Sequence, residues 1–141
     1  MSISKPFNLT KWIKDNRDLL KPPVGNKNLY KDSGDYIVMI VGGPNARKDY
    51  HYNKTEELFY QLEGHIEVHI QEDGEKKTMT LGPGDMYLHP AKVPHSPVRH
   101  KGSIGLVIER KRINLEVKDG LLWYCDQCNQ KLHDVYFPLE D

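Results

Sequence analysis

Short runs of aromatic and β-branched residues, separated by Gly and Pro, recur along most of the chain and restrict its fold most strongly. Runs of this length are typical of strands rather than of globular helices. In residues 65–70 apolar and polar side chains alternate, so we expect Ile66, Val68 and Ile70 inside and His65 and His69 on the surface. Many short strands between turn residues predict an all-β barrel.

The pattern predicts one helix and a series of strands. Asn8 is a good helix N-cap, apolar residues recur at helical spacing up to Leu20, and Pro22-Pro23 ends the helix. We expect this short helix to pack on the outside of the barrel, and residues 24–34 to form a mobile loop near its mouth. The predicted strands are 36–41, 47–51, 57–62, 65–70, 78–81, 86–89, 93–98, 103–110 and 121–124. Asp73-Gly74 and Asp119-Gly120 are interpreted as turns.

Length and charge exclude several classes of protein. The 141 residues suit one domain, and no linker or repeat divides them. Lys plus Arg (20) balance Asp plus Glu (20), so no net charge favours nucleic acid or a membrane surface as a partner. No apolar run has spanning length and no signal-peptide pattern follows Met1, which predicts a soluble cytoplasmic protein.

Two histidines and a glutamate form the candidate metal site. His51, Glu57 and His95 supply two imidazoles and one carboxylate, a set that suits non-heme Fe(II) and leaves coordination positions open. The residues around them resemble the two motifs of the cupin superfamily. The first motif falls on His51, Asn53, Glu57 and Gly64, and the second on Gly84, Pro90, His95 and Arg99. The resemblance implies a single cupin (double-stranded β-helix, jelly-roll-like) barrel over residues 1–141.

Two departures from the general cupin pattern carry information about the site. Asn53 stands where a second histidine is usual, so three protein ligands are expected rather than four. Arg99 stands where Asn is frequent, and a guanidinium beside a metal favours an anionic substrate.

Arg47 would point to the same side as His51 if residues 47–51 form a strand. His89 is interpreted as a supporting or structural residue. Glu109 shares a strand face with Val107, but which face meets the cavity stays open.

Five segments in order extend the resemblance to nearly the whole chain. They are 42–51, 56–61, 94–99, 108–110 and 123–128, and together they are similar to the bacterial type of the 3-hydroxyanthranilate 3,4-dioxygenase family. The resemblance implies Fe(II) held by His51, Glu57 and His95, and a substrate site lined by Arg47, Pro97, Arg99 and Glu109.

The resemblance also implies roles and partners. Glu109 would act as general base, and Arg47 and Arg99 would bind the ring carboxylate or steady developing charge, without a choice between the two. The substrates would be 3-hydroxyanthranilate and O₂, the product 2-amino-3-carboxymuconate semialdehyde, the precursor of quinolinate in tryptophan catabolism and NAD biosynthesis. A cytoplasmic homodimer is expected. The alternatives are another cupin Fe(II) oxygenase, or a metal-containing cupin that binds a small organic acid without turnover.

The two cysteines, Cys125 and Cys128, form a Cys-x-x-Cys pair in the tail 123–141. In the family such a pair resembles half of a four-thiolate site, which would bind a structural iron or zinc. The sequence contains no second pair, and a structural metal normally needs four ligands. Three interpretations stay open: an incomplete or absent site, a site completed by another chain or by further residues, and a redox pair.

Overall fold

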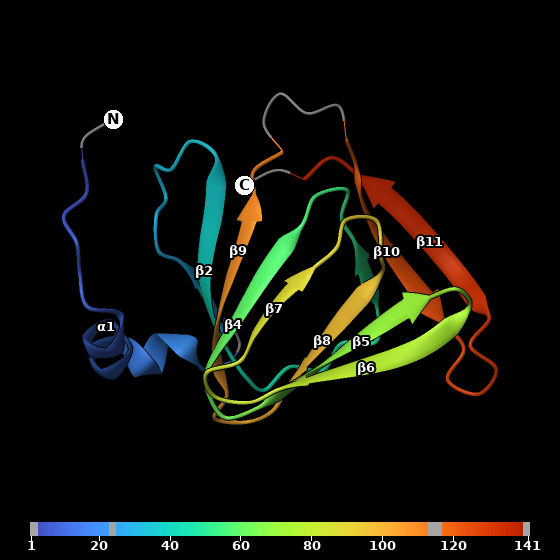
Figure 1. Ribbon diagram of the computed structural model, residues 1–141, viewed down its shortest axis with the longest axis horizontal. Helices are drawn as coiled ribbons and strands as arrows, with labels where there is room; N and C mark the ends of the chain where they lie inside the picture. The colour runs from blue at the N-terminus through green and yellow to red at the C-terminus, as the bar shows by residue number, and fades with distance from the viewer. Residues whose placement is uncertain (1–2, 23–24, 113–116, 140–141) are drawn as a thin grey trace.

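Two antiparallel sheets face each other and a short helix lies beside one of them (Figure 1). The computed structural model describes residues 3–22, 25–112 and 117–139. One sheet has the strand order β1-β2-β9-β4-β7 and the other the order β11-β10-β3-β8-β5-β6. The strands are β1 (Asn26–Asn28), β2 (Tyr36–Gly42), β3 (Tyr50–Tyr52), β4 (Glu57–Glu63), β5 (Ile66–Glu72), β6 (Glu75–Leu81), β7 (Met86–His89), β8 (His95–Arg99), β9 (Ile104–Arg110), β10 (Asp119–Tyr124) and β11 (Lys131–Phe137). The all-β fold class with a short N-terminal helix is confirmed.

The helix begins where the sequence predicted. The Asn8 side chain accepts a hydrogen bond from the Lys11 amide (2.9 Å), and α1 (Leu9–Asn16) continues into the 3₁₀ helix η1 (Arg17–Leu20). Ile13 and Leu20 are buried against Ile40 and Ile104, on the outer face of the β1-β2-β9-β4-β7 sheet. The helix therefore covers one end of that outer face.

The main core lies between the two sheets. Ile66, Val68 and Ile70 are buried, as the alternation predicted, and they pack with Phe59 and Val107 of the opposite sheet. His65 is exposed and His69 is half-buried beside Glu67. The Asp73-Gly74 turn is confirmed, since Glu72 pairs with Glu75 and both turn residues have positive φ. This core fixes the two sheets to each other beneath the candidate site.

Four local predictions were wrong. Residues 47–49 are not a strand, because the pairing of β3 with its neighbours begins only at Tyr50. Part of the expected loop 24–34 is the short strand β1, which pairs with β2. Asp119-Gly120 is not a turn but the start of β10, and β11 follows the cysteines where no strand was predicted.

Across the described ranges, every helix falls short of the length and apolarity that a bilayer crossing requires.

Candidate active site

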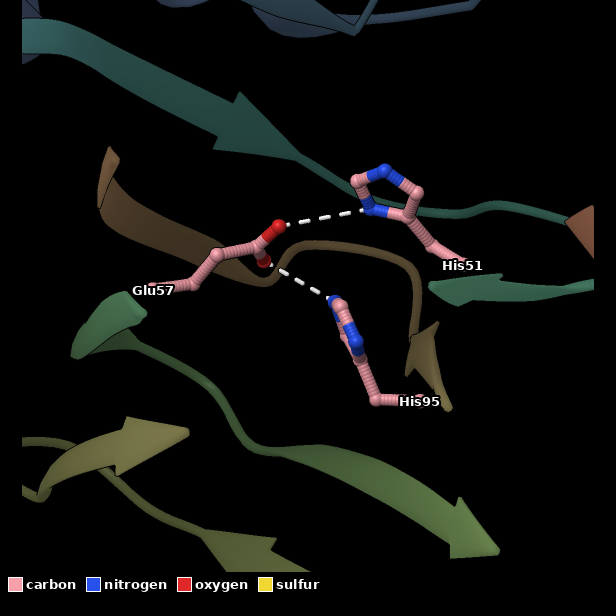
Figure 2. Close-up of side chains that lie close together, drawn as sticks. All are labelled: His51, Glu57 and His95. Carbon is pink, nitrogen blue, oxygen red and sulfur yellow. Dashed lines mark hydrogen bonds and ion pairs between the residues drawn. The ribbon is translucent and has the colours of Figure 1, made fainter. Parts of the chain in front are cut away.

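His51, Glu57 and His95 converge from the two sheets (Figure 2). His51 on β3 and His95 on β8 are register partners in one sheet, and Glu57 begins β4 in the other. The Glu57 carboxylate lies between the rings, with Oε1 3.3 Å from His51 Nδ1 and Oε2 2.9 Å from His95 Nε2. One donor atom from each residue falls within 4.8 Å of the others, so the three side chains that the sequence singled out form one group.

Asn53 holds the glutamate in place instead of extending the group. Its side-chain nitrogen donates to Glu57 Oε1 at 3.0 Å, and its oxygen accepts from the amide and hydroxyl of Thr55 at 2.8 Å each. Burial opposes the charge on Glu57, but the charge of His95 and hydrogen bonds from both histidines hold the pKa of Glu57 well below its usual value. The site therefore presents an ionised carboxylate with two imidazoles.

A buried carboxylate that the sequence analysis missed lies behind His51. Asp119 Oδ2 is 2.5 Å from His51 Nε2, and the Arg112 guanidinium donates to both Asp119 oxygens, at 3.1 and 2.8 Å. Burial lowers the pKa of His51, but the hydrogen bonds to Asp119 and Glu57 outweigh it and raise the pKa to about 9. The only sequence signal for Asp119 was an Asp-Gly pair, which is also the signature of a turn.

His89 supports His95 from beneath. Its ring centroid is 4.3 Å from that of His95, Tyr87 donates its hydroxyl to Nδ1 at 2.9 Å, and Nε2 lies 2.7 Å from the Val93 carbonyl. Burial and the nearby His95 lower the pKa of His89 to about 4, so the ring is neutral and donates from Nε2. The interpretation of His89 as a supporting residue agrees with these contacts.

A cavity of about 700 Å³ opens onto the His–Glu–His group. Its apolar lining includes Met39, Val41, Phe59, Pro97 and Val107, and its polar lining includes Arg47, Arg99 and Glu109 beside the three candidate ligands. All four residues expected at a substrate site therefore line the same cavity. Its size and its few convergent polar groups are typical of small-molecule sites.

Arg99 is a buried cation with an unused donor. The residue is 5% exposed, and its Nη1 finds no hydrogen-bond partner within the part of the chain that the structure describes. Asn45 fixes its backbone: the Asn45 side-chain oxygen accepts from the Arg99 amide at 2.8 Å. Burial lowers the pKa of Arg99 to about 10 despite nearby Glu57, so the guanidinium stays charged at neutral pH. A buried, unsatisfied N–H that lines a cavity is expected to bind an anion.

Arg47 occupies a different environment. Its side chain is 41% exposed and makes a two-point ion pair with Asp49, with Nε–Oδ1 at 3.1 Å and Nη2–Oδ2 at 2.5 Å. Arg47 therefore lies in the cavity lining with its Nε and Nη2 engaged by Asp49, whereas Arg99 is buried with an Nη1 that no described residue accepts.

Glu109 settles which face of β9 meets the cavity. Val107 and Glu109 line it, while Leu106 and Ile108 lie on the opposite, outer face. Glu109 stands directly across from Glu57 in the β4–β9 register. Burial and the charge of Glu57 raise the pKa of Glu109 to about 8. A divalent cation bound to Glu57 would offset that charge, and so lower the pKa of Glu109.

Cys125 and Cys128 lie in the loop between β10 and β11, outside the cavity lining. Both are free thiols, and the Cys128 amide points to Cys125 Sγ at 3.5 Å. Backbone amides of Cys128 and Gln127 lower the pKa of the Cys125 thiol. The loop favours a thiolate at Cys125, but the pair takes no part in the His–Glu–His group.

The donor set fits a divalent transition metal. Two imidazoles and one carboxylate form a set that binds non-heme Fe(II) and leaves coordination positions open. Glu57 and His95 are buried and His51 is half-buried, and His95 Nδ1 has no hydrogen-bond partner among the described residues. Without a cation, the three side chains can only bond to each other and to their supports.

Two facing antiparallel sheets around such a group define a cupin with a candidate metal centre. Two solved structures share the fold. One is a cupin-2 domain containing protein from Shewanella frigidimarina, with a TM-score of 0.54 and 22% sequence identity; the match covers 69% of this chain and 89% of that chain. The other is a protein from Neisseria meningitidis, with a TM-score of 0.57 and 17% identity; the match covers 75% of this chain and 98% of that chain. At these identities the likeness shows the fold alone.

Sequence comparison identifies the family within this class. The family described as 3-hydroxyanthranilic acid dioxygenase matches residues 1–141. The 3-hydroxyanthranilate 3,4-dioxygenase of Xanthomonas campestris pv. campestris is 54% identical over 136 residues, which are 96% of this chain and 76% of that one. The enzyme of the same name from Bacillus thuringiensis is 48% identical over 136 residues, 96% and 75% of the two chains. The chain belongs to the 3-hydroxyanthranilic acid dioxygenase family.

Proposed function

We propose that the protein uses Fe(II), held by His51, Glu57 and His95, to cleave the ring of 3-hydroxyanthranilate with O₂. The product would be 2-amino-3-carboxymuconate semialdehyde, which closes to quinolinate without further catalysis. Family membership and the names of the relatives support this activity. The observation that carries it is one cavity lined by the His–Glu–His group and by a buried arginine whose Nη1 has no hydrogen-bond partner among the described residues.

The cavity lining supports a flat aromatic acid as substrate. The free Nη1 of Arg99 supports the assignment of Arg99 to the ring carboxylate, because a buried charged donor gains most from a charged acceptor. Arg47, already paired with Asp49, would add positive charge from the more exposed part of the lining. Pro97 would contact one face of the ring, with Phe59 and Val107 excluding water around it.

Glu109 would handle the substrate proton. It lies across from Glu57, next to the candidate metal position, and burial raises its pKa. A carboxylate in this place could accept a proton from the substrate hydroxyl or amine within hydrogen-bond reach. When bound, Fe(II) supplies the electron transfer that lets the aromatic ring react with O₂.

Oxygen consumption tests the activity. The purified protein, stripped with a chelator and reloaded with Fe(II), is expected to consume O₂ with 3-hydroxyanthranilate and to form an absorbing semialdehyde. Anthranilate lacks the hydroxyl group, and we expect no O₂ uptake with it. Protein that binds Fe(II) but consumes no O₂ with 3-hydroxyanthranilate would contradict the proposal. The alternatives would then be another cupin Fe(II) oxygenase, or a metal-containing cupin that binds a small organic acid without turnover.

We also propose that Cys125 and Cys128 contribute two thiolates to a second, structural iron or zinc site, completed by ligands from another chain or from further residues. The amides directed at Cys125 support a thiolate there. Metal analysis tests this: the variant with Cys125→Ser and Cys128→Ser should lose the second metal and keep the first, with an unchanged turnover per catalytic iron. Equal metal content in variant and wild type would contradict the second site.

We propose that two copies associate through the outer face of the β1-β2-β9-β4-β7 sheet. Two rows of uncharged side chains cross four strands in register: Val38, Ile108, Leu58 and Leu88 in one, Ile40, Leu106, Tyr60 and Met86 in the other. The helix covers the Ile40 end, whereas Met86 is 65% and Leu88 55% exposed. Because the rows carry no charge, an equally uncharged partner fits best. A second copy related by a two-fold axis supplies one.

A further inference from the structure

Asp119 and Arg112 form a buried ion pair that does not line the cavity. The Arg112 guanidinium contacts both Asp119 oxygens, through Nε at 3.1 Å and Nη2 at 2.8 Å, and its Nη1 donates to the Arg110 carbonyl at 2.5 Å. Asp119 is 1% exposed. The pair can therefore affect a bound substrate only through the residues that it contacts.

Each end of this pair contacts a residue of the candidate site. Asp119 Oδ2 lies 2.5 Å from His51 Nε2, and Arg112 Nη1 lies 3.5 Å from Glu109 Oε1. Arg112 lies two residues beyond the end of β9 in one sheet, and Asp119 begins β10 in the other. The pair thus links the two sheets and connects a candidate metal ligand to the candidate base.

The His51 contacts divide its two ring nitrogens between different tasks. Nε2 faces Asp119, whereas Nδ1 faces Glu57 at 3.3 Å. A carboxylate that accepts a hydrogen bond from Nε2 keeps the proton on that nitrogen. The proton that a metal would displace is then the one on Nδ1, whose lone pair is directed at the position between His51, Glu57 and His95. Carboxylates behind metal-binding histidines fix the ring orientation in this way and increase metal affinity.

We propose that the Asp119–Arg112 pair is a positioning device: it orients His51 to present Nδ1 to the metal, and it holds Glu109 beside the same position. The inference rests on the proposed metal centre. A purely structural role would not require charge, because uncharged residues of similar volume often fill such a position with equal or greater stability. Here both members are charged: the Asp119 carboxylate accepts a hydrogen bond from His51, and the Arg112 guanidinium pairs with the Glu109 carboxylate.

Metal affinity, measured without substrate or O₂, tests the positioning of His51. Asp119→Asn keeps the size of the side chain but removes its charge, and Co(II) affinity, measured by competition with a chelator, is expected to fall about 10- to 100-fold. The visible spectrum of bound Co(II) should change as well, because His51 is no longer held in one orientation. Asp134→Asn, which removes a paired surface carboxylate from the same β10–β11 hairpin, is the control and should bind Co(II) like wild type.

Arg112→Lys tests the pair if Asp119→Asn does not fold. Lysine keeps the positive charge but loses the two-point contact, so Co(II) affinity should fall several-fold, and kcat at saturating Fe(II) should fall more than KM changes, because Glu109 loses a fixed neighbour. Wild-type Co(II) affinity and an unchanged spectrum in either folded variant would overturn the inference. An equal loss in Asp134→Asn would overturn it too. Because these titrations omit the reaction, wild-type protein that binds Co(II) but lacks activity would count against the proposed function alone.

Discussion

Glu57 is the only negatively charged member of the His–Glu–His group, and it bridges both imidazoles. Replacing it by alanine leaves two neutral ligands for a divalent cation. We expect Glu57→Ala to lose most of its Fe(II), and with it the ring cleavage, while the fold persists because the core lies below the site. Metal analysis after gel filtration, with circular dichroism as the check on folding, measures this.

Glu67→Ala is the control for the Glu57 variant. Glu67 lies on β5, where it faces away from the core and its carboxylate contacts the ring of His69. Its replacement should leave the iron content unchanged. Full iron content and a near-normal rate in Glu57→Ala would show that the carboxylate ligand is elsewhere.

Sequence reasoning could find the three candidate ligands because the cupin motifs place them at fixed intervals. It could not find Asp119, which contacts His51 from 68 positions away and belongs to no motif. It also left the two arginines equivalent, since their difference lies in burial and partners: Arg99 is buried with one N–H that no described residue accepts, whereas Arg47 is bound to Asp49. Such differences depend on the packing of distant strands.

Strand β9 provides space for the guanidinium of Arg99. A Cβ on Gly105 would lie 2.7 Å from Gln61 Oε1 and 3.1 Å from Arg99 Nη1, so either side chain would have to shift. Gly105→Ala is therefore expected to move the Arg99 guanidinium and to raise the KM for 3-hydroxyanthranilate about tenfold, with Fe(II) binding kept.

Steady-state kinetics and iron content of Gly105→Ala measure this effect. Gly34→Ala is the matched control, because an added Cβ at Gly34 meets no atom within 4 Å. Its KM should equal that of wild type. A normal KM in Gly105→Ala would show that Arg99 does not need its present position for substrate binding.

At the scale of elements, regular patterns were predictable and exceptions were not. The alternation of residues 66–70 gave β5 its inner and outer faces, and the Asn8 cap marked the start of α1. The strand β11 was missed because its burial does not alternate: most of its residues are exposed while β10 supplies its hydrogen bonds. The Asp119-Gly120 pair was misread because its extended conformation is set by pairing with β3 and β11.

The outer face of the β1-β2-β9-β4-β7 sheet yields a prediction for the whole molecule. Leu88→Lys places a charge at the exposed end of one uncharged row, which a second copy would have to bury unpaired. Sedimentation velocity should show a dimer for wild type and a shift to monomer for the variant. Met79→Lys, on β6 of the other sheet, is equally a lysine in place of an exposed apolar residue and should remain dimeric. A monomeric wild type, or a dimeric Leu88→Lys, would contradict this interface.

The sequence predicted the all-β fold class and the three candidate ligands of the molecule, but not how its cavity is assembled. The two motifs and the turn residues are local, whereas the cavity combines residues of β2, β3, β4, β8 and β9. The central claim concerns that cavity: one end holds the metal, and Arg99 binds the substrate carboxylate. Both must act on the same small molecule.

The most direct test combines a substrate change with a residue change. Two substrates, 3-hydroxyanthranilate and 2-aminophenol, which lacks the carboxylate, are compared by their kcat/KM values in wild type and in Arg99→Ala, each loaded with Fe(II). Wild type should prefer 3-hydroxyanthranilate by on the order of a hundredfold, because an unpaired buried charge costs a few kcal/mol. In Arg99→Ala the preference should nearly vanish, since neither substrate then has a partner for a carboxylate. A preference that survives in Arg99→Ala, or an Fe(II)-loaded wild type that turns over neither compound, would contradict the account.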